Sequence, residues 1–277
     1  QNSAQKELGI HYNNLPDYLV GLQQAVNTPY SPFSHLGLQD KMGEPTQIND
    51  HVLQIENEYY SLVRPKQVPL AGETPSQALA NRGVGYVELR AVDVNPYSDI
   101  GIDEDTAGFL EVLALYCLMQ DSPELYDQEL EDIEKNQAEV VNRGRAPNAV
   151  IIEHKKQVPI LKWMGQHLDH MQSLARVLNQ TYASRIYTQA LETMKQRIHK
   201  VDETLSAKVI QDTLSHKGTW SFGSEMANQH AQSYEAHVLK PDTIEYFKGL
   251  AQSSLQKQQQ LEQECTQSFD EYLTAFR

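Results

Sequence analysis

Two short segments of this chain alternate apolar and polar residues, as β-strands do. The first runs from Val52 to Arg64 and the second from Tyr86 to Val92. Because successive side chains of a strand point to opposite faces, every second residue shares a face. The alternation therefore predicts two strands, each with one mostly apolar face and one polar face.

The polar faces of these expected strands carry carboxylates close to an arginine. Glu56, Glu58, Tyr60 and Arg64 lie on the polar face of the first strand, and Glu88 and Arg90 on that of the second. Glu88 and Arg90 are two residues apart, or roughly 7 Å along a strand. A carboxylate suits Mg2+, and an arginine beside it offers a planar fork for phosphate oxygens. An ordinary surface ion pair has the same spacing, so spacing alone leaves both interpretations open.

The rest of the sequence predicts mainly helix. Apolar residues recur at spacings of three and four from Asp103 onward. The expected helices cover 104–120, 123–142, 160–180, 182–200, 202–216, 224–239 and 241–276. Earlier in the chain, we expect short helices at 12–26, with Asn14 as N-cap, and at 74–80, with Thr74 as N-cap. We also expect a loop over 28–50, and we expect the first strand to end at Pro65.

These patterns predict an α+β protein with two regions. A sheet region with short helices is expected over residues 1–102, and a mainly helical region over 103–277. The net charge of −14 argues against a general nucleic-acid-binding protein. No apolar run approaches the roughly 18 residues that a membrane helix needs, so no membrane partner is expected.

The two cysteines show no metal-binding spacing, which fits a reducing compartment and a cytoplasmic protein. Cys117 lies in an apolar helical run, so we expect a buried thiol. Trp163 and Trp220 are expected to pack in the interior. His167 and His170 are three apart on an expected helix, as two zinc ligands could be, but no third ligand is in obvious reach.

Several sequence blocks around the two expected strands resemble the proteobacterial type of glutamate–cysteine ligase (γ-glutamylcysteine synthetase). The blocks that carry the resemblance are Leu8–Ile10, Tyr18–Val26, Gln47–Asn49, Val52–Glu58, Arg64–Lys66, Gly72–Ser76, Tyr86–Arg90, Asp93–Pro96 and Gly101–Asp103. The resemblance is dense from about residue 8 to residue 125 and thin afterwards.

The resemblance implies a fold related to glutamine synthetase, with an antiparallel sheet curved around the active site. It implies ATP-dependent joining of the γ-carboxylate of L-glutamate to the amine of L-cysteine through a γ-glutamyl phosphate, the first step of glutathione biosynthesis. It also implies that Glu88 is a Mg2+ ligand and that Arg90 contacts the nucleotide phosphates and takes part in catalysis. Tyr60 would line the cysteine pocket.

Members of that family are about twice as long as this chain, and their other metal-binding carboxylates lie in the N-terminal half. The chain begins at Gln1, so we expect the C-terminal part of such an enzyme, without its N-terminal half and inactive by itself. Two alternatives stay open. One is another ATP-dependent carboxylate–amine ligase of the same superfamily, and the other is a non-catalytic helical binding module that carries a two-stranded ribbon.

Overall fold

The structure is a computed structural model that describes residues 8–276. These residues form two compact units. One unit combines the described residues up to Val92 with those from Val238 onward, and the other runs from Asp93 to His237. The units are defined by packing, whereas the predicted boundary after residue 102 separates a sheet region from a helical region. That boundary stays a prediction.

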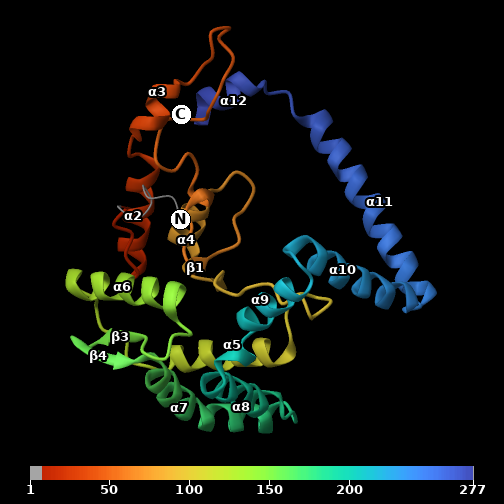
Figure 1. The fold of residues 1–277 in the computed structure, drawn as a ribbon. Helices are drawn as coiled ribbons and strands as arrows, with labels where there is room; N and C mark the ends of the chain where they lie inside the picture. Colours follow the sequence, from red (N-terminus) through yellow and green to blue (C-terminus); the bar gives the residue numbers. More distant parts are fainter. Residues whose placement is uncertain (1–7, 277) are drawn as a thin grey trace. The chain divides into compact units, whose positions relative to one another are not determined.

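The described residues of the first unit form one antiparallel pair of strands among both short and long helices (Figure 1). Its elements are α2 (Leu15–Val26), α3 (Ser31–Leu36), the 3-10 turn η1 (Glu56–Glu58), β1 (Val63–Lys66), α4 (Pro75–Arg82), β2 (Tyr86–Leu89), α11 (Pro241–Glu264) and α12 (Phe269–Phe276). Its core joins α2 and α4 to the segment before β1. The buried apolar side chains of this core are Ile10, Tyr18, Leu22, Ala25, Leu53, Tyr59 and Leu79.

The N-caps predicted for the first two helices are confirmed. The Asn14 side chain accepts a hydrogen bond from the backbone N–H of Asp17 at 2.9 Å. Thr74 accepts one from the N–H of Gln77, and the Gln77 side chain in turn accepts the N–H of Thr74. These bonds pair N–H groups that have no partner inside the helix, and they place both helix starts where the sequence signals put them.

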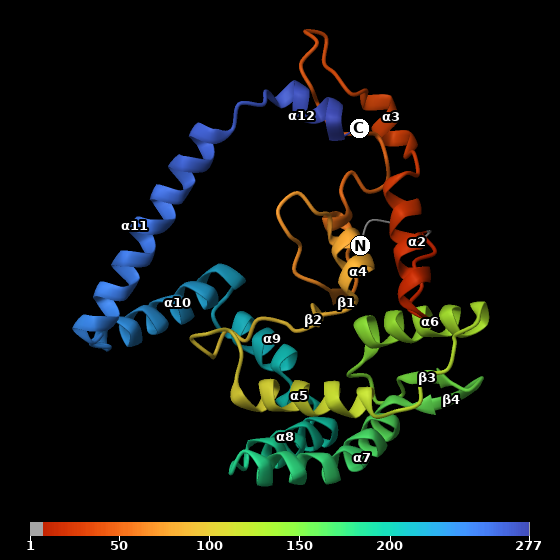
Figure 2. The same ribbon diagram turned by 180° about the vertical axis from the view of Figure 1, so that it is seen from behind.

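The second unit is mainly helical. Its elements are α5 (Glu104–Leu118), α6 (Asp127–Arg143), β3 (Val150–Glu153), β4 (Lys156–Pro159), α7 (Ile160–Thr181), α8 (Ile186–His199), η2 (Val201–Glu203), α9 (Leu205–Ser215) and α10 (Thr219–Ala236). Its core lies between α5, α7 and α8, which both views show side by side (Figure 2). The buried members of this core are Val112, Leu168, Met171, Ala175, Leu178, Tyr187, Leu191 and Ile198. The predicted α+β class, with antiparallel strands and many helices, is confirmed.

The first predicted strand is wrong over most of its length, because β1 begins only at Val63. Side chains capture backbone groups in the preceding segment. The Glu58 carboxylate accepts the N–H of Gln54 at 2.7 Å, and the Glu56 carboxylate accepts the N–H of Ser76 at 2.7 Å. Such bonds compete with a strand ladder. As a result Glu56–Glu58 forms a 3-10 turn, and Glu56, Glu58 and Tyr60 do not share a strand face.

Pro65 does not end the strand but lies inside β1, opposite Val87. A proline is tolerated there because each strand of a two-stranded sheet is an edge strand. The second predicted strand is confirmed as β2, although it ends at Leu89. Pairing continues for one bond beyond it, since the Arg90 N–H donates to the Leu62 carbonyl at 2.8 Å.

The hairpin of β3 and β4 was not predicted. His154 and Lys155 form its turn, and both have positive φ, at 47° and 63°. Tight hairpin turns with positive φ at both central residues usually carry Asn-Gly or Asp-Gly, so a His-Lys turn gives no sequence signal. The predicted loop over 28–50 likewise contains a helix, α3.

The long helix expected over 241–276 is interrupted between Glu264 and Phe269, which separates α11 from α12. The helix predicted at 224–239 begins earlier, at Thr219. The expectation that Cys117 is buried is wrong, because α5 turns Gly108 and Val112 inward and leaves Cys117 exposed. Trp163 is partly buried, as predicted, whereas Trp220 is exposed.

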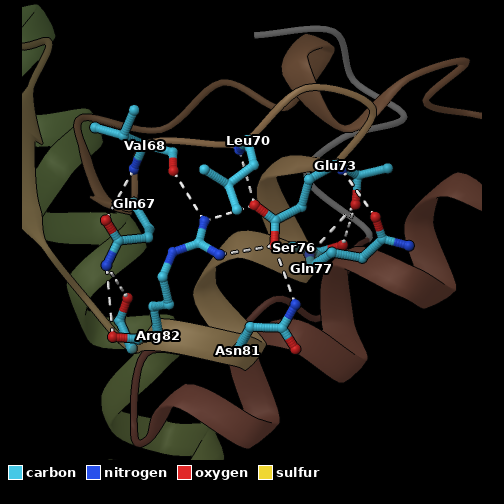
Figure 3. A network of polar contacts seen from close by, with 10 residues as sticks. Gln67, Val68, Leu70, Glu73, Ser76, Gln77, Asn81 and Arg82 are labelled. Carbon is cyan, nitrogen blue, oxygen red and sulfur yellow. Dashed lines mark hydrogen bonds and ion pairs between the residues drawn. The ribbon is translucent and has the colours of Figure 1, made fainter.

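A polar network closes the loop between β1 and α4 (Figure 3). Arg82 and Glu73 form a two-pronged ion pair, with Arg82 Nη1 donating to Oε1 at 3.0 Å and Nη2 to Oε2 at 2.5 Å. Arg82 also donates to the Val68 carbonyl, and Glu73 accepts the Leu70 N–H. The Arg82 hydrogen bonds, together with the Leu70 N–H, lower the pKa of Glu73 to about 2. The network fastens this loop to the end of α4.

We predict that Glu73 stabilises this loop in a pH-dependent way. Since its folded pKa of about 2 lies below the ordinary 4.5, its contribution is present above pH 4.5 and is lost as the pH falls towards 2. Glu73→Gln should therefore speed hydrogen exchange of residues 68–82 at pH 7, and the difference from the parent protein should shrink below pH 4.5. Exchange measured by mass spectrometry checks this. A difference that persists unchanged at pH 3 would contradict it, and Glu131→Gln, on exposed helix surface, is the control.

Candidate functional site

The strand pair β1 and β2 gathers four charged residues on one face. In the register of the pair, Arg64 lies opposite Glu88 and Lys66 opposite Tyr86. Residues directly opposite each other share a face, and so do residues two apart. Arg64, Lys66 and Glu88 therefore share this face, and Arg90 follows Glu88 two residues on. We call Arg64, Lys66, Glu88 and Arg90 the charged face.

Glu88 is the centre of this face. Its Oε2 atom lies 3.0 Å from Arg90 Nε and 3.7 Å from Lys66 Nζ. Glu88 and Arg90, which the spacing placed close together, thus form an ion pair. Lys66 also contacts Glu88, from the other strand. The Arg90 hydrogen bond is the main cause that lowers the pKa of Glu88, so this carboxylate is ionised at neutral pH.

The pKa of Lys66 shows which charges dominate on the charged face. Burial is the main cause that lowers its pKa, and the positive charge of Arg64 lowers it further. Glu88 acts in the opposite direction but does not outweigh them. Three cations thus surround one carboxylate, and the face carries an excess of positive charge in a chain whose net charge is −14.

The charged face is also the less exposed face of the strand pair. Arg64 is only 2% exposed, whereas Val63, Val87 and Leu89 on the apolar face are 43%, 59% and 40% exposed. A strand pair with one buried face ordinarily turns its apolar side inward. Here the polar groups are held against the body of the unit, where charges act more strongly on one another than in water.

Tyr60 lies outside this face. It follows η1 and precedes β1, so the strand alternation that grouped it with Glu56 and Glu58 is wrong, and its ring is partly exposed. Glu56 and Glu58 do not form a carboxylate pair on a strand face either. Glu56 binds the N–H and hydroxyl of Ser76 at the start of α4, a favourable place for a negative charge.

The sequence pattern placed Arg64 on the polar face of the first expected strand, but it identified neither Arg64 nor Lys66 as a site residue. The available signal was their spacing of two in Arg64–Lys66, which puts both on one strand face. It could not be used without the register, because only the pairing with β2 shows that Glu88 lies opposite Arg64.

Metal-binding groups are sparse in the described part of the chain. Across residues 8–276, no three His, Cys, Asp or Glu side chains lie together as they would around a metal ion. His167 instead contacts the Tyr116 hydroxyl at 3.1 Å and packs against Trp163. The zinc interpretation of His167 and His170 therefore finds no support. Nor does any helix of the described residues combine the length and apolar content of a membrane span.

Comparisons with known proteins define the fold class and then the family. The family model for glutamate–cysteine ligase matches residues 1–140. The glutamate–cysteine ligase of Azotobacter vinelandii is 38% identical over 278 residues, covering 100% of this chain and 52% of that protein. That of Pseudomonas aeruginosa (strain LESB58) is 36% identical with the same coverage.

Comparison with solved structures leads to the same family as comparison of sequences. The crystal structure of the Francisella tularensis glutamate–cysteine ligase in complex with AMP has a TM-score of 0.90 and 31% identity, and covers 99% of this chain and 54% of that one. A bifunctional glutathione synthetase from Pasteurella multocida, at 21% identity and a TM-score of 0.59, shares the fold alone. The fold is thus that of an α+β ligase of this type. The chain belongs to the glutamate–cysteine ligase family, and it spans about half the length of the curated relatives it matches.

We predict a measurable coupling between Glu88 and Arg90. Because the pair is partly shielded from water, a double-mutant cycle with Glu88→Gln and Arg90→Gln should give a coupling free energy of about 0.5–1 kcal/mol, the upper part of the range for such pairs. Urea unfolding at neutral pH measures it. The same cycle on the exposed pair Glu131–Lys135 should give a smaller value. Equal couplings for the two pairs would show that the charged face gains nothing from its burial.

Proposed function

We propose that this chain supplies one side of the active site of an ATP-dependent ligase, which joins the γ-carboxylate of L-glutamate to the amine of L-cysteine. The observation that carries the proposal is the charged face in a chain of this family, where Glu88 pairs with Arg90 and Lys66. An excess of positive charge on a strand face suits the phosphates of a nucleotide.

The chemistry has two steps, in which all atoms are accounted for. An oxygen of the glutamate γ-carboxylate attacks the terminal phosphorus of ATP, and ADP leaves, which gives γ-glutamyl phosphate. The cysteine amine then attacks the acyl carbon, loses a proton and expels phosphate. Neither step needs a covalent bond to the protein, so binding, orientation and charge stabilisation are the tasks left to its side chains.

Within this scheme, Arg90 and Lys66 bind phosphate oxygens. Their side chains are 31% and 17% exposed, so each is partly shielded yet reaches the surface. Arg90 acts as the catalytic residue of this chain, since its fixed positive charge stabilises the negative charge of the phosphoryl group as it is transferred. Tyr60 lines the pocket of the cysteine. Its ring is partly exposed, so it can contact a ligand from the protein surface.

Glu88 fits Mg2+ as one ligand of a shared site. Mg2+ commonly takes one or two protein carboxylates together with substrate phosphates and water, and Glu88 is an ionised carboxylate beside phosphate-binding cations. When bound, Mg2+ neutralises charge on the transferred group. Among the described residues, Glu88 is not part of a group of three or more His, Cys, Asp or Glu side chains that could hold a metal ion. Its remaining ligands would come from the phosphates, water and the part of the enzyme that this chain does not span.

A cytoplasmic location is part of the same proposal. Both cysteines, Cys117 and Cys265, are free and exposed. Exposed free thiols persist in a reducing compartment and are prone to oxidation outside it.

We predict that the 277-residue chain by itself forms no γ-glutamylcysteine. A single carboxylate leaves the metal site incomplete, and phosphoryl transfer depends on that metal for charge neutralisation. Incubation with ATP, Mg2+, L-glutamate and L-cysteine, followed by mass spectrometry of the products, checks this. Product above the level of a Glu88→Gln control would contradict it.

We further predict that the chain is active within a full-length context. We would build a chimera of the Azotobacter vinelandii relative and this chain. The chimera keeps the part of the relative that this chain does not match, and this chain replaces the matched part. The chimera should form γ-glutamylcysteine. Glu88→Gln should lower kcat/KM by about 100-fold or more, because it removes a metal ligand needed in the transition state.

Two controls make this experiment decisive. Glu131→Gln removes an exposed carboxylate of α6 and should leave kcat/KM unchanged. Circular dichroism of each variant verifies that the chimera is folded. A folded chimera that ligates only other amines would favour another carboxylate–amine ligase. A folded chimera that turns over no ATP would favour a non-catalytic module.

A further inference from the structure

Arg64 is a buried cation that forms no ion pair within the described residues, although the Glu88 carboxylate lies opposite it in the strand register. It is 2% exposed, and its Nε and Nη1 atoms are buried with no hydrogen-bond partner among the described residues. Within residues 8–276, no carboxylate oxygen forms an ion pair with it. The segment that includes Arg64 therefore places a full positive charge in the interior of the first unit, where charges are normally paired.

The neighbours of Arg64 compensate for its burial only weakly. Nη2 lies 3.5 Å from the Glu56 carbonyl oxygen, and the guanidinium carbon lies 5.8 Å from the centre of the Tyr59 ring. Burial raises the pKa of the Tyr18 and Tyr59 phenols, so both are neutral at physiological pH. Arg64 also interacts with the Tyr18 phenol and, without an ion-pair contact, with the Glu88 carboxylate. These contacts are weak beside the desolvation of a buried ion, which costs several kcal/mol unless the ion is closely paired.

The same unit contains an arginine that is fully paired, which makes the contrast clear. Arg82 contacts both carboxylate oxygens of Glu73 as well as the Val68 carbonyl (Figure 3). Arg82 has side-chain exposure of 34%, where an ion pair matters least for stability. Among the described residues of this unit, the outer arginine thus forms an ion pair with a carboxylate, and the buried one does not.

The position of Arg64 on the charged face suggests why a buried charge without an ion-pair contact is kept. Arg64 lies directly opposite Glu88 and two residues from Lys66. A charge in a poorly hydrated setting acts on its neighbours at several ångströms with little screening. Its influence on Lys66 is visible, since the charge of Arg64 helps to lower the pKa of that lysine.

We propose that Arg64 is a positioning residue of the phosphate site: its buried charge keeps the charged face net positive and so strengthens the binding of a polyphosphate by Lys66 and Arg90. The inference rests on the proposed function for the phosphate-binding role of those two residues. Arg64 itself is too deeply buried to touch the ligand and acts through them.

The balance of charge favours a polyphosphate over a single carboxylate. Arg64, Lys66 and Arg90 against Glu88 leave an excess of two positive charges. A monocarboxylate carries one negative charge, whereas a polyphosphate chain carries several on adjacent groups, which two partly exposed cations can contact together.

Tripolyphosphate binding to the full 277-residue chain tests the inference, with isothermal titration for affinity and thermal unfolding without ligand for stability. Arg64→Met should bind tripolyphosphate about tenfold more weakly or worse, because it removes a nearby charge. Arg64→Lys, which keeps the charge without the fork, should stay within about threefold of the parent protein. Lys248→Met, on the exposed surface of α11, should leave the affinity unchanged.

Stability should move in the opposite direction from affinity. Arg64→Met should unfold at the same or a higher temperature than the parent protein, because it removes a buried charge that forms no close ion pair. A purely structural role predicts the reverse, with Arg64→Met and Arg64→Lys both lowering the unfolding temperature and affinity falling only as far as stability does. That result would overturn the inference. So would unchanged affinity in Arg64→Met, tighter binding of glutarate than of tripolyphosphate, or no tripolyphosphate binding at all.

This inference and the proposed function can fail separately. An inactive folded chimera, together with tripolyphosphate binding that depends on the charge at position 64, would refute the ligase function and retain the inference. An active chimera with unchanged affinity in Arg64→Met would refute the inference alone.

Discussion

The burial of charge on the β1–β2 strand pair is the constraint around which the candidate site is organised. An isolated two-stranded ribbon would gain most by turning Val63, Val87 and Leu89 inward, yet these side chains are exposed and Arg64 is buried. Charged groups removed from water interact strongly, which is costly for folding and useful for binding a charged ligand. The strand pair thus trades stability for electrostatic strength, as functional sites commonly do.

The scaffold that holds this arrangement is the small core of the first unit. Leu53 and Tyr59 anchor the segment before β1 against α2, and Glu56 fastens it to the start of α4. Once both ends of this segment are attached, the direction in which β1 leaves is set, and Arg64 points towards the core. The 3-10 turn at Glu56–Glu58 therefore contributes to the site by orienting the strand, although it contributes no ligand to the charged face.

Much of the site could be anticipated, and the part that could not has a physical cause. The spacing of Glu88 and Arg90 predicted neighbours on one strand, and they form an ion pair at 3.0 Å. Lys66 was missed because its contact with Glu88 crosses between strands and depends on register, which residue spacing within one strand does not encode. Tyr60 was grouped wrongly because side-chain bonds of Glu56 and Glu58 replaced the expected ladder.

The sequence itself determined most of the helices and the N-caps at Asn14 and Thr74, since these depend on local periodicity and on capping side chains. It also determined the α+β class and, through its sequence blocks, the family resemblance. Tertiary structure alone decided which face of the strand pair is buried and which cations surround Glu88. It also decided that Arg64 is buried without an ion pair to any described residue. These properties depend on contacts between segments far apart in the chain. The cost of a charge depends on its surroundings, and local sequence does not specify those surroundings.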